Sequence, residues 1–156
     1  MITMQIIGAR ELVARLDAMP GRVKDGLARA VARLGLELQR KVQAEKLTGQ
    51  VLKVRTGSLR SSINTEISEA AEEVAASVGT NIRYARIHEY GVDHPWLIEA
   101  KAAKALRFEI GGRTVFARSV RHPPLPERSF LRSALREMQP KIEAGLREAV
   151  AQAIRT

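Results

Sequence analysis

The chain has 156 residues, a net charge of +9, no cysteine and only six aromatic residues. This length predicts one domain with a single modest core of aliphatic side chains. The absence of cysteine excludes disulfides, thiolate catalysis and cysteine-ligated metal sites. No apolar run approaches the roughly 18–20 residues of a membrane span, and the first residues lack the pattern of a secretory signal. We therefore expect a protein that is soluble or assembled into something soluble, with no membrane partner.

The charge is divided into blocks along the chain. Residues 1–60 carry 12 basic and 5 acidic side chains, residues 61–100 carry 2 and 7, and residues 101–156 carry 12 and 5. A uniformly basic chain favours nucleic-acid binding. Alternating blocks favour surfaces that complement one another, within one subunit or between copies. Solvated helix faces with surplus lysine and arginine explain the same pattern equally well.

The first long segment carries one apolar helical stripe. Apolar residues recur at spacings of three and four, which is typical of a helix with one buried face. Pro20-Gly21 interrupts the stripe, and proline is tolerated in the first turn of a helix but not in its interior. We predict a short helix to about Ala18 and a long one from Pro20 to about Lys46. The stripe consists of Leu12, Leu16, Met19, Val23, Leu27, Val31, Leu34, Leu38 and Val42.

Segment 47–58, LTGQVLKVRTGS, is predicted to be a loop with exposed Lys53 and Arg55. We expect this loop to be mobile in the free subunit and ordered only after assembly. The alternative is a static loop that packs on its own domain through three apolar side chains, Val51, Leu52 and Val54.

Two hairpins follow. Apolar residues alternate over 63–67 and again over 74–78, on either side of an acidic turn, which predicts an antiparallel pair. A second alternation over 106–110 leads into Gly111-Gly112, a turn that tolerates positive φ, and a returning strand. Between the hairpins, Ile82–Tyr90 is predicted to be helical, with Gly91 as its C-terminal cap.

A C-terminal helix is predicted over about 127–155, with Pro140 expected to kink or split it near Gln139. The whole layout predicts a single α+β domain over residues 1–156. In it, a long N-terminal helix and a C-terminal helix pack on a small antiparallel sheet of two hairpins.

No catalytic, metal or cofactor site is predicted. His88-Glu89 begins a string, HEYGVDH, that resembles a zinc-binding pattern, but His94 lies six residues after His88 instead of four. His122 lies in a His-Pro-Pro segment, which is more typical of a stiff loop. The sequence also shows no glycine-flanked nucleophile, no phosphate-binding glycine loop and no carboxylate pair.

The segment RTGSLRSSI has two interpretations. Arg55 and Arg60 flank a Thr-Gly-Ser turn, whose exposed N–H groups could bind an anion. The alternative, which the chemistry favours, is a loop leading into a strand, in which the hydroxyls satisfy local backbone groups.

Three segments in order, RTGSLRSSI, GTNIRYARIHEYG and LPERSFLRSAL, closely resemble the tail-completion or minor tail-component proteins of long-tailed siphophages. The resemblance covers roughly residues 9–140. Ser129 departs from the family pattern, which prefers proline there, and this affects only the stiffness of the helix entry. The matching positions are Thr56, Gly57, Leu59, Arg60, Ser62 and Ile63, then Tyr84, Ala85, His88, Glu89, Tyr90 and Gly91, then Arg128, Phe130 and Leu131.

The resemblance implies a structural, non-enzymatic virion protein that is assembled in the bacterial cytoplasm. It implies a ring, for example a hexamer, that completes the tail or joins it to the head. The implied partners are other copies, neighbouring neck and tail-terminator proteins, and DNA in the channel at close range. The expected contact residues are Lys53, Arg55, Thr56, Gly57, Arg60, Tyr84, His88, Glu89, Tyr90, Arg128 and Phe130.

Two other functions remain open from the sequence. A basic nucleic-acid-binding protein would explain the 26 lysine and arginine residues, although the aromatic residues are few and scattered for base stacking. A metal hydrolase built on His88, Glu89 and His94 would require bound metal.

Overall fold

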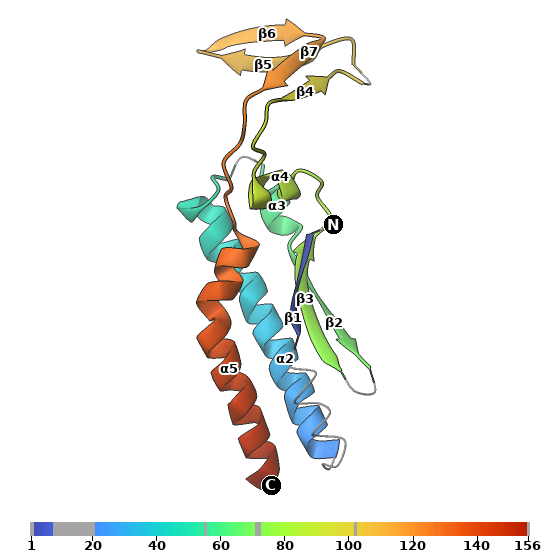
Figure 1. Cartoon of the computed structure of the whole chain (residues 1–156), viewed down its shortest axis with the longest axis vertical. Coiled ribbons are helices and arrows are strands. Elements are labelled where there is room, and N and C mark those ends of the chain that lie inside the picture. The colour runs from blue at the N-terminus through green and yellow to red at the C-terminus, as the bar shows by residue number, and fades with distance from the viewer. Residues whose placement is uncertain (1, 8–20, 55, 71–72, 102, 156) are drawn as a thin grey trace.

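The computed structural model shows an elongated body of two long helices and one sheet, from which a separate arm of β-strands projects (Figure 1). Two short helices, α3 (Ser58–Ser61) and α4 (Ala85–Tyr90), lie at the end of the body where the arm begins. The structure describes residues 2–7, 21–54, 56–70, 73–101 and 103–155.

Helix α2 (Gly21–Lys41) is the long helix that the apolar stripe predicts. The stripe residues from Val23 to Val42 are all buried, because the helical period places them on one face. The chain continues as η1 (Val42–Gln50), in which Leu47 (φ −102°, ψ 16°) and Gly49 (φ 126°, ψ −15°) have non-helical backbone angles, so regular helix ends near the predicted Lys46. The short helix predicted before Ala18 lies outside the described residues.

A three-stranded antiparallel sheet lies against α2, with strand order β1-β3-β2. The predicted first hairpin is confirmed as β2 (Asn64–Glu69) and β3 (Val74–Thr80). Strand β1 (Ile2–Ile7), which was not predicted, pairs with the other edge of β3. Gly35 allows α2 to approach the sheet closely, since a Cβ there would lie 2.7 Å from the Cβ of Ala76.

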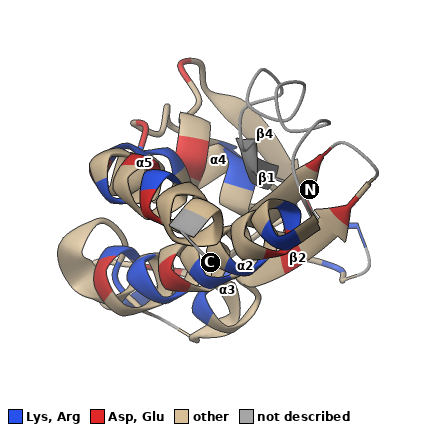
Figure 2. Ribbon diagram, turned by 90° about the horizontal axis from the view of Figure 1, so that it is seen from below, with Lys and Arg blue, Asp and Glu red and all other residues tan. Residues whose placement is uncertain are grey.

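Helix α5 (Leu131–Arg155) runs antiparallel to α2 and packs on the side of α2 that faces away from the sheet (Figure 1; seen end-on in Figure 2). The predicted α+β class is therefore confirmed, with the helices stacked in succession on the sheet. The shared core includes Leu34, Leu38, Val42, Ile63, Val78, Ala85, Phe130, Leu131, Ala134, Met138 and Ile142.

Pro140 does not split α5, which is continuous from Leu131 to Arg155. Proline removes one hydrogen bond to the carbonyl four residues earlier, at Arg136. Both residues lie on the exposed side of the helix, where water can satisfy that carbonyl. The expected split is therefore wrong, whereas the expected kink stays a prediction.

The second predicted hairpin is confirmed as β5 (Leu106–Ile110) and β6 (Arg113–Ala117), with Gly111 at φ 57° and Gly112 at φ 77°. It does not join the body sheet. It belongs to the arm, residues 92–125, together with the pair β4 (Trp96–Glu99) and β7 (Ser119–His122). A bridge between Val92 and Leu125 closes the base of the arm.

Within the described ranges, no helix is both long enough and apolar enough to cross a membrane.

Candidate functional site

The three motif segments meet around one open cleft of about 870 Å³ at the arm end of the body. We call it the motif cleft. The end of η1 and the loop that follows contribute most of the lining. Helices α3 and α4 add further side chains, and Arg128 comes from the segment that leads into α5. It is lined by Leu47, Gly49, Val51, Leu52, Lys53, Val54, Thr56, Gly57, Leu59, Arg60, Tyr84, His88 and Arg128.

The loop wall of the cleft is held at its start by the backbone of η1. The carbonyl of Lys46 accepts hydrogen bonds from the N–H groups of Val51 and Leu52, at 3.3 and 3.2 Å. Gly49, at φ 126°, turns the chain there, a conformation that favours glycine. Leu52 is buried, whereas Lys53 and Val54 are exposed. The static packing expected through Leu52 is thus present at the start of the loop, and the mobility of its remainder stays a prediction.

The Thr-Gly-Ser turn uses its hydroxyls locally. Thr56 Oγ1 lies 3.0 Å from Ser58 Oγ, and Ser62 Oγ donates to the carbonyl of Leu59 at 2.8 Å. Ser62 Oγ also lies 2.7 Å from Thr80 Oγ1 on β3. These bonds agree with the interpretation that the hydroxyls satisfy local groups, but the turn leads first into the short helix α3 and only then into β2. An anion bound by this turn stays a prediction.

Glu89 is fully buried, and its carboxylate caps the N-terminus of α5. Its Oε2 accepts from the backbone N–H groups of Phe130 and Leu131, at 2.8 and 2.9 Å. Its Oε1 accepts from the N–H of Arg132 at 2.9 Å and from the hydroxyl of Ser129 at 3.0 Å. A carboxylate here satisfies helix N–H groups that would otherwise lack partners, and it complements the helix dipole.

Arg132 reinforces this joint from its partly exposed side. Its guanidinium donates to Glu89 Oε1 at 3.2 Å, to the Glu89 carbonyl at 3.0 Å and to Glu127 Oε1 at 2.8 Å. It also lies 4.6 Å from the centroid of the exposed Tyr90 ring. Both oxygens of Glu89 are therefore occupied by structural hydrogen bonds, which argues against a role for this carboxylate as a general base.

His88 lies half-buried at the floor of the cleft. Burial lowers the pKa of its imidazole below 6.5, and the nearby Arg128 guanidinium lowers it further. The N–H of Arg128 donates to the carbonyl of His88 at 2.8 Å, which joins the third motif to the second. The ring of Tyr84 meets that of His88 edge-on, with centroids 6.1 Å apart. A neutral imidazole at neutral pH is the consequence.

The cleft is basic and partly apolar. Lys53, Arg60 and Arg128 contribute positive charge, and no aspartate or glutamate is among the described residues that line it. Val54 and Tyr84 are 50% and 45% exposed, so apolar surface lies between the cations. Such a surface suits an acidic segment with some apolar side chains.

Seven of the eleven expected contact residues line the cleft, namely Lys53, Thr56, Gly57, Arg60, Tyr84, His88 and Arg128. Glu89 and Phe130 are buried beneath it, so they support the site and are not available as contacts. Tyr90 is exposed beside Arg132, and Arg55 lies outside the described residues. The sequence analysis did not predict the apolar part of the cleft lining. The signal for it was a group of apolar residues in this segment, Val51, Leu52, Val54 and Leu59.

The three histidines are not brought together as ligands of one metal. His94 is exposed and contacts the Asp93 carboxylate at 2.7 Å, and His122 stacks on Trp96 in the arm with ring centroids 4.1 Å apart. Among the described residues, no group of three or more histidine, aspartate or glutamate side chains could hold a metal ion.

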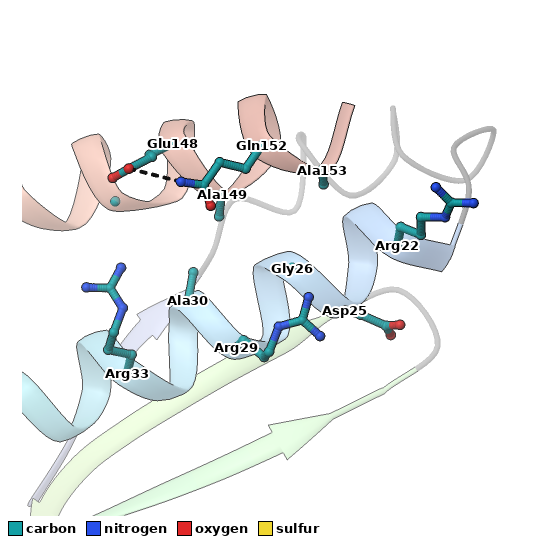
Figure 3. A pocket seen from close by; sticks show the side chains of 11 residues that line it. Arg22, Asp25, Gly26, Arg29, Ala30, Arg33, Glu148, Ala149, Gln152 and Ala153 are labelled. Carbon is teal, nitrogen blue, oxygen red and sulfur yellow. Dashed lines mark hydrogen bonds between the residues drawn. The ribbon is translucent and has the colours of Figure 1, made fainter. Parts of the chain in front are cut away.

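A second groove of about 500 Å³ lies between the free ends of α2 and α5 (Figure 3). Small side chains face each other across it, and a Cβ at Gly26 would lie 3.5 Å from the Cβ of Ala153. Arg29 and Arg33 extend from α2 at its edge. Glycine and alanine allow two helices to approach closely, and this packing accounts for the groove.

Comparison with known sequences covers most of the chain. The sequence model of the phage virion morphogenesis family matches residues 23–155, which includes all three motif segments. Searches of curated proteins and of solved structures found no significant match.

Proposed function

This chain belongs to the phage virion morphogenesis family, and from that premise we propose that it completes the tail of a long-tailed phage, or joins tail to head, as a subunit of a ring. The family indicates a structural role in building the virion. The finer assignment to the tail end or neck is our proposal, and a ring would use two different surfaces of each subunit.

One observation supports this proposal most directly. Segments up to 81 positions apart in the chain, from Leu47 to Arg128, surround a single cleft, and residues that resemble tail-completion proteins line it. Its basic and apolar lining suits recognition of a protein surface. The most distinctive carboxylate of the motifs, Glu89, is used for structure.

The proposal includes the partners. The subunit contacts other copies in a ring, for example a hexamer, and the neighbouring neck and tail-terminator proteins of the virion. Assembly takes place in the cytoplasm of the host bacterium, and the finished ring surrounds a channel through which DNA passes.

Complementation in a phage that lacks this protein tests the role. Arg60→Glu and Lys53→Glu reverse charge in the motif cleft, and we expect heads and tails that accumulate unjoined, visible by electron microscopy. Arg147→Glu, an equal charge change on the exposed side of α5, is the matched control and should still give complete particles. Joined, infectious particles from the cleft variants, or absence of the wild-type chain from purified particles, would contradict the proposal.

A basic nucleic-acid-binding protein is the second candidate, and the sequence pI of about 10.6 favours it. Phosphate contacts weaken steeply as salt rises because binding releases counterions. A gel-shift titration with duplex DNA over increasing salt measures this. Tight, salt-sensitive binding by the free chain would favour a DNA-binding role, whereas an apolar ring contact should persist.

A further inference from the structure

The arm has no core of its own. None of its described side chains is buried, although several are large and apolar. Leu97, Ile110 and Phe116 are 58%, 62% and 67% exposed. Two-stranded sheets are marginally stable in water without a covering surface. An arm of this composition is therefore suited to contact with another surface.

The exposed apolar side chains of the arm lie beside arginines. Phe116 is directly opposite Arg107 across the β5–β6 pair, and Leu97 is opposite Arg121 across the β4–β7 pair. Cross-strand partners project from the same face of a sheet. Its described basic residues, Lys101, Lys104, Arg107, Arg113, Arg118 and Arg121, outnumber its acidic ones, Asp93, Glu99 and Glu109.

The body carries a surface of opposite charge on β2. This strand lies at the edge of the described sheet, so one side of its backbone has no strand partner there. Glu66 and Glu69 are exposed on it, and Ile67 between them is 45% exposed. Figure 2 shows the acidic segments of the β2–β3 hairpin in red. We call Glu66, Ile67 and Glu69 the acidic edge.

The arm and the acidic edge lie apart in one molecule. The arm projects beyond one end of the body, whereas β2 runs along its side toward the opposite end (Figure 1). A contact between them must therefore join two copies. Each copy has both an arm and an acidic edge. Because these two surfaces differ, the contact can repeat from one subunit to the next.

We propose that the arm of one subunit docks on the acidic edge of the next copy of this chain. Ile67 and Glu69 share one face of β2, where they meet the Phe116–Arg107 pair, and Glu66 lies on the other face, where it meets the Leu97–Arg121 pair. Open strand edges on both sides also permit backbone pairing, as in strand addition. The inference rests on the proposed function only in requiring that copies assemble.

Other occupants fit less well. DNA would gain from the arginines but not from Phe116, Leu97 or Ile110, and Glu99 and Glu109 would repel phosphate. The motif cleft of a neighbouring copy is itself basic and would repel the arm.

A charge-swap experiment in phage particles tests the contact. Arg107→Glu with Arg121→Glu places like charges together and should lower the copies of the chain per particle about tenfold or more. Glu66→Arg with Glu69→Arg should lower incorporation similarly, and the two pairs combined in one chain should restore it. The matched control, Arg136→Glu with Arg147→Glu on α5, should incorporate normally. Quantitative mass spectrometry measures incorporation, and circular dichroism checks that each variant is folded.

Disulfide trapping provides a second measurement, since the chain has no cysteine. Phe116→Cys and Ile67→Cys chains, co-expressed during phage growth, should form a disulfide between the two different variants in purified particles. Like-with-like disulfides only, or none, would overturn the contact.

The outcomes separate the two proposals. A wild-type chain absent from particles defeats the proposed function and the contact together. Normal incorporation of the arm variant defeats the contact alone. The contact is also wrong if the arm variant is incorporated less and the combined charge swap does not restore incorporation. In that case, arm-dependent binding of duplex DNA in a gel shift would identify DNA as the partner.

Discussion

At the scale of single residues, Glu89 shows how a motif position can be structural. Its position next to His88 suggested chemistry, yet its carboxylate accepts hydrogen bonds from three backbone N–H groups at the start of α5. The joint between α4 and α5 supports Arg128 and His88 at the cleft. The motif therefore acts on the site indirectly, by orienting its lining.

Replacing Glu89 should destabilise the protein strongly. Glu89→Ala removes the buried acceptor of three helix N–H groups, and we expect a loss of about 3 kcal/mol or more in the free energy of unfolding. Glu89→Gln should also destabilise, because its amide NH₂ would face N–H donors on one side. Urea denaturation measures both. Glu127→Gln, which alters only the exposed partner of Arg132, should change stability by less than about 1 kcal/mol, and an equal effect of the two glutamine variants would contradict this assignment.

The lowered pKa of His88 predicts a pH dependence of stability. In the unfolded chain the imidazole binds its proton near pH 6.5, whereas burial in the folded chain delays protonation to lower pH. At a pH between 6.5 and the lowered pKa of His88, the unfolded state binds more protons than the folded state. The free energy of unfolding should therefore fall as the pH falls through this range. Urea unfolding across this range measures the slope, and His88→Asn should reduce it. An unchanged slope in that variant would contradict the prediction.

At the scale of elements, a mutation in the β5–β6 turn should destabilise the arm locally and leave the stability of the body unchanged, because this hairpin lies in the arm. Gly111 and Gly112 both have positive φ, so Gly111→Val or Gly112→Val should weaken the β5–β6 hairpin by about 1 kcal/mol or more. Since none of the arm's described side chains is buried in the body core, the loss should appear as local opening. Hydrogen exchange of the β5–β6 amides should accelerate about fivefold, while the body stays protected. Thr114→Val, in the same hairpin at an ordinary strand position, is the control.

The loop after η1 provides a second test at this scale. Lys53 is exposed, and we expect trypsin to cleave the free protein first at Lys53 or Arg55. Burial of the loop against a neighbour should protect the same bonds in assembled particles. Limited proteolysis followed by mass spectrometry locates the first cut. Equal protection of these bonds in the free protein and in assembled particles would show instead that the loop is static in both.

At the scale of the whole molecule, body and arm are separate in packing. The body core combines α2, α5, α4 and the sheet, and the arm joins it through two chain segments bridged by Val92 and Leu125. Their backbone N–H groups each donate to the other's carbonyl, at 2.8 and 2.9 Å. The paired base places the two ends of the arm next to each other.

Replacing residues 94–123 by a tight Asn-Gly turn should therefore leave the body folded. Thermal unfolding followed by circular dichroism should show a midpoint close to that of the full chain, because none of the removed side chains that the structure describes is buried. A large fall in the midpoint would mean that the arm stabilises the body. Incorporation into particles should be lost even though the body folds.

The sequence by itself determined the elements whose patterns are local. Period-3.6 stripes specified α2 and α5, alternation specified β2 and β3, and the paired glycines specified the β5–β6 turn, because each signal arises between neighbouring residues. The motif residues of the cleft were identified through the resemblance of three segments to a known family. The family match over residues 23–155 then confirmed the class of protein.

Only the tertiary structure decided how these elements combine. Strand β1 pairs with a segment 68 to 78 residues away, from Ile7↔Ala75 to Ile2↔Thr80, and the second hairpin leaves the body sheet for the arm. Alternation shows that a strand has two faces, but not which surface will cover either one. Likewise, nothing local distinguishes the buried Glu89 from the exposed Glu127, because the difference lies in the helix N-terminus that folding brings to Glu89.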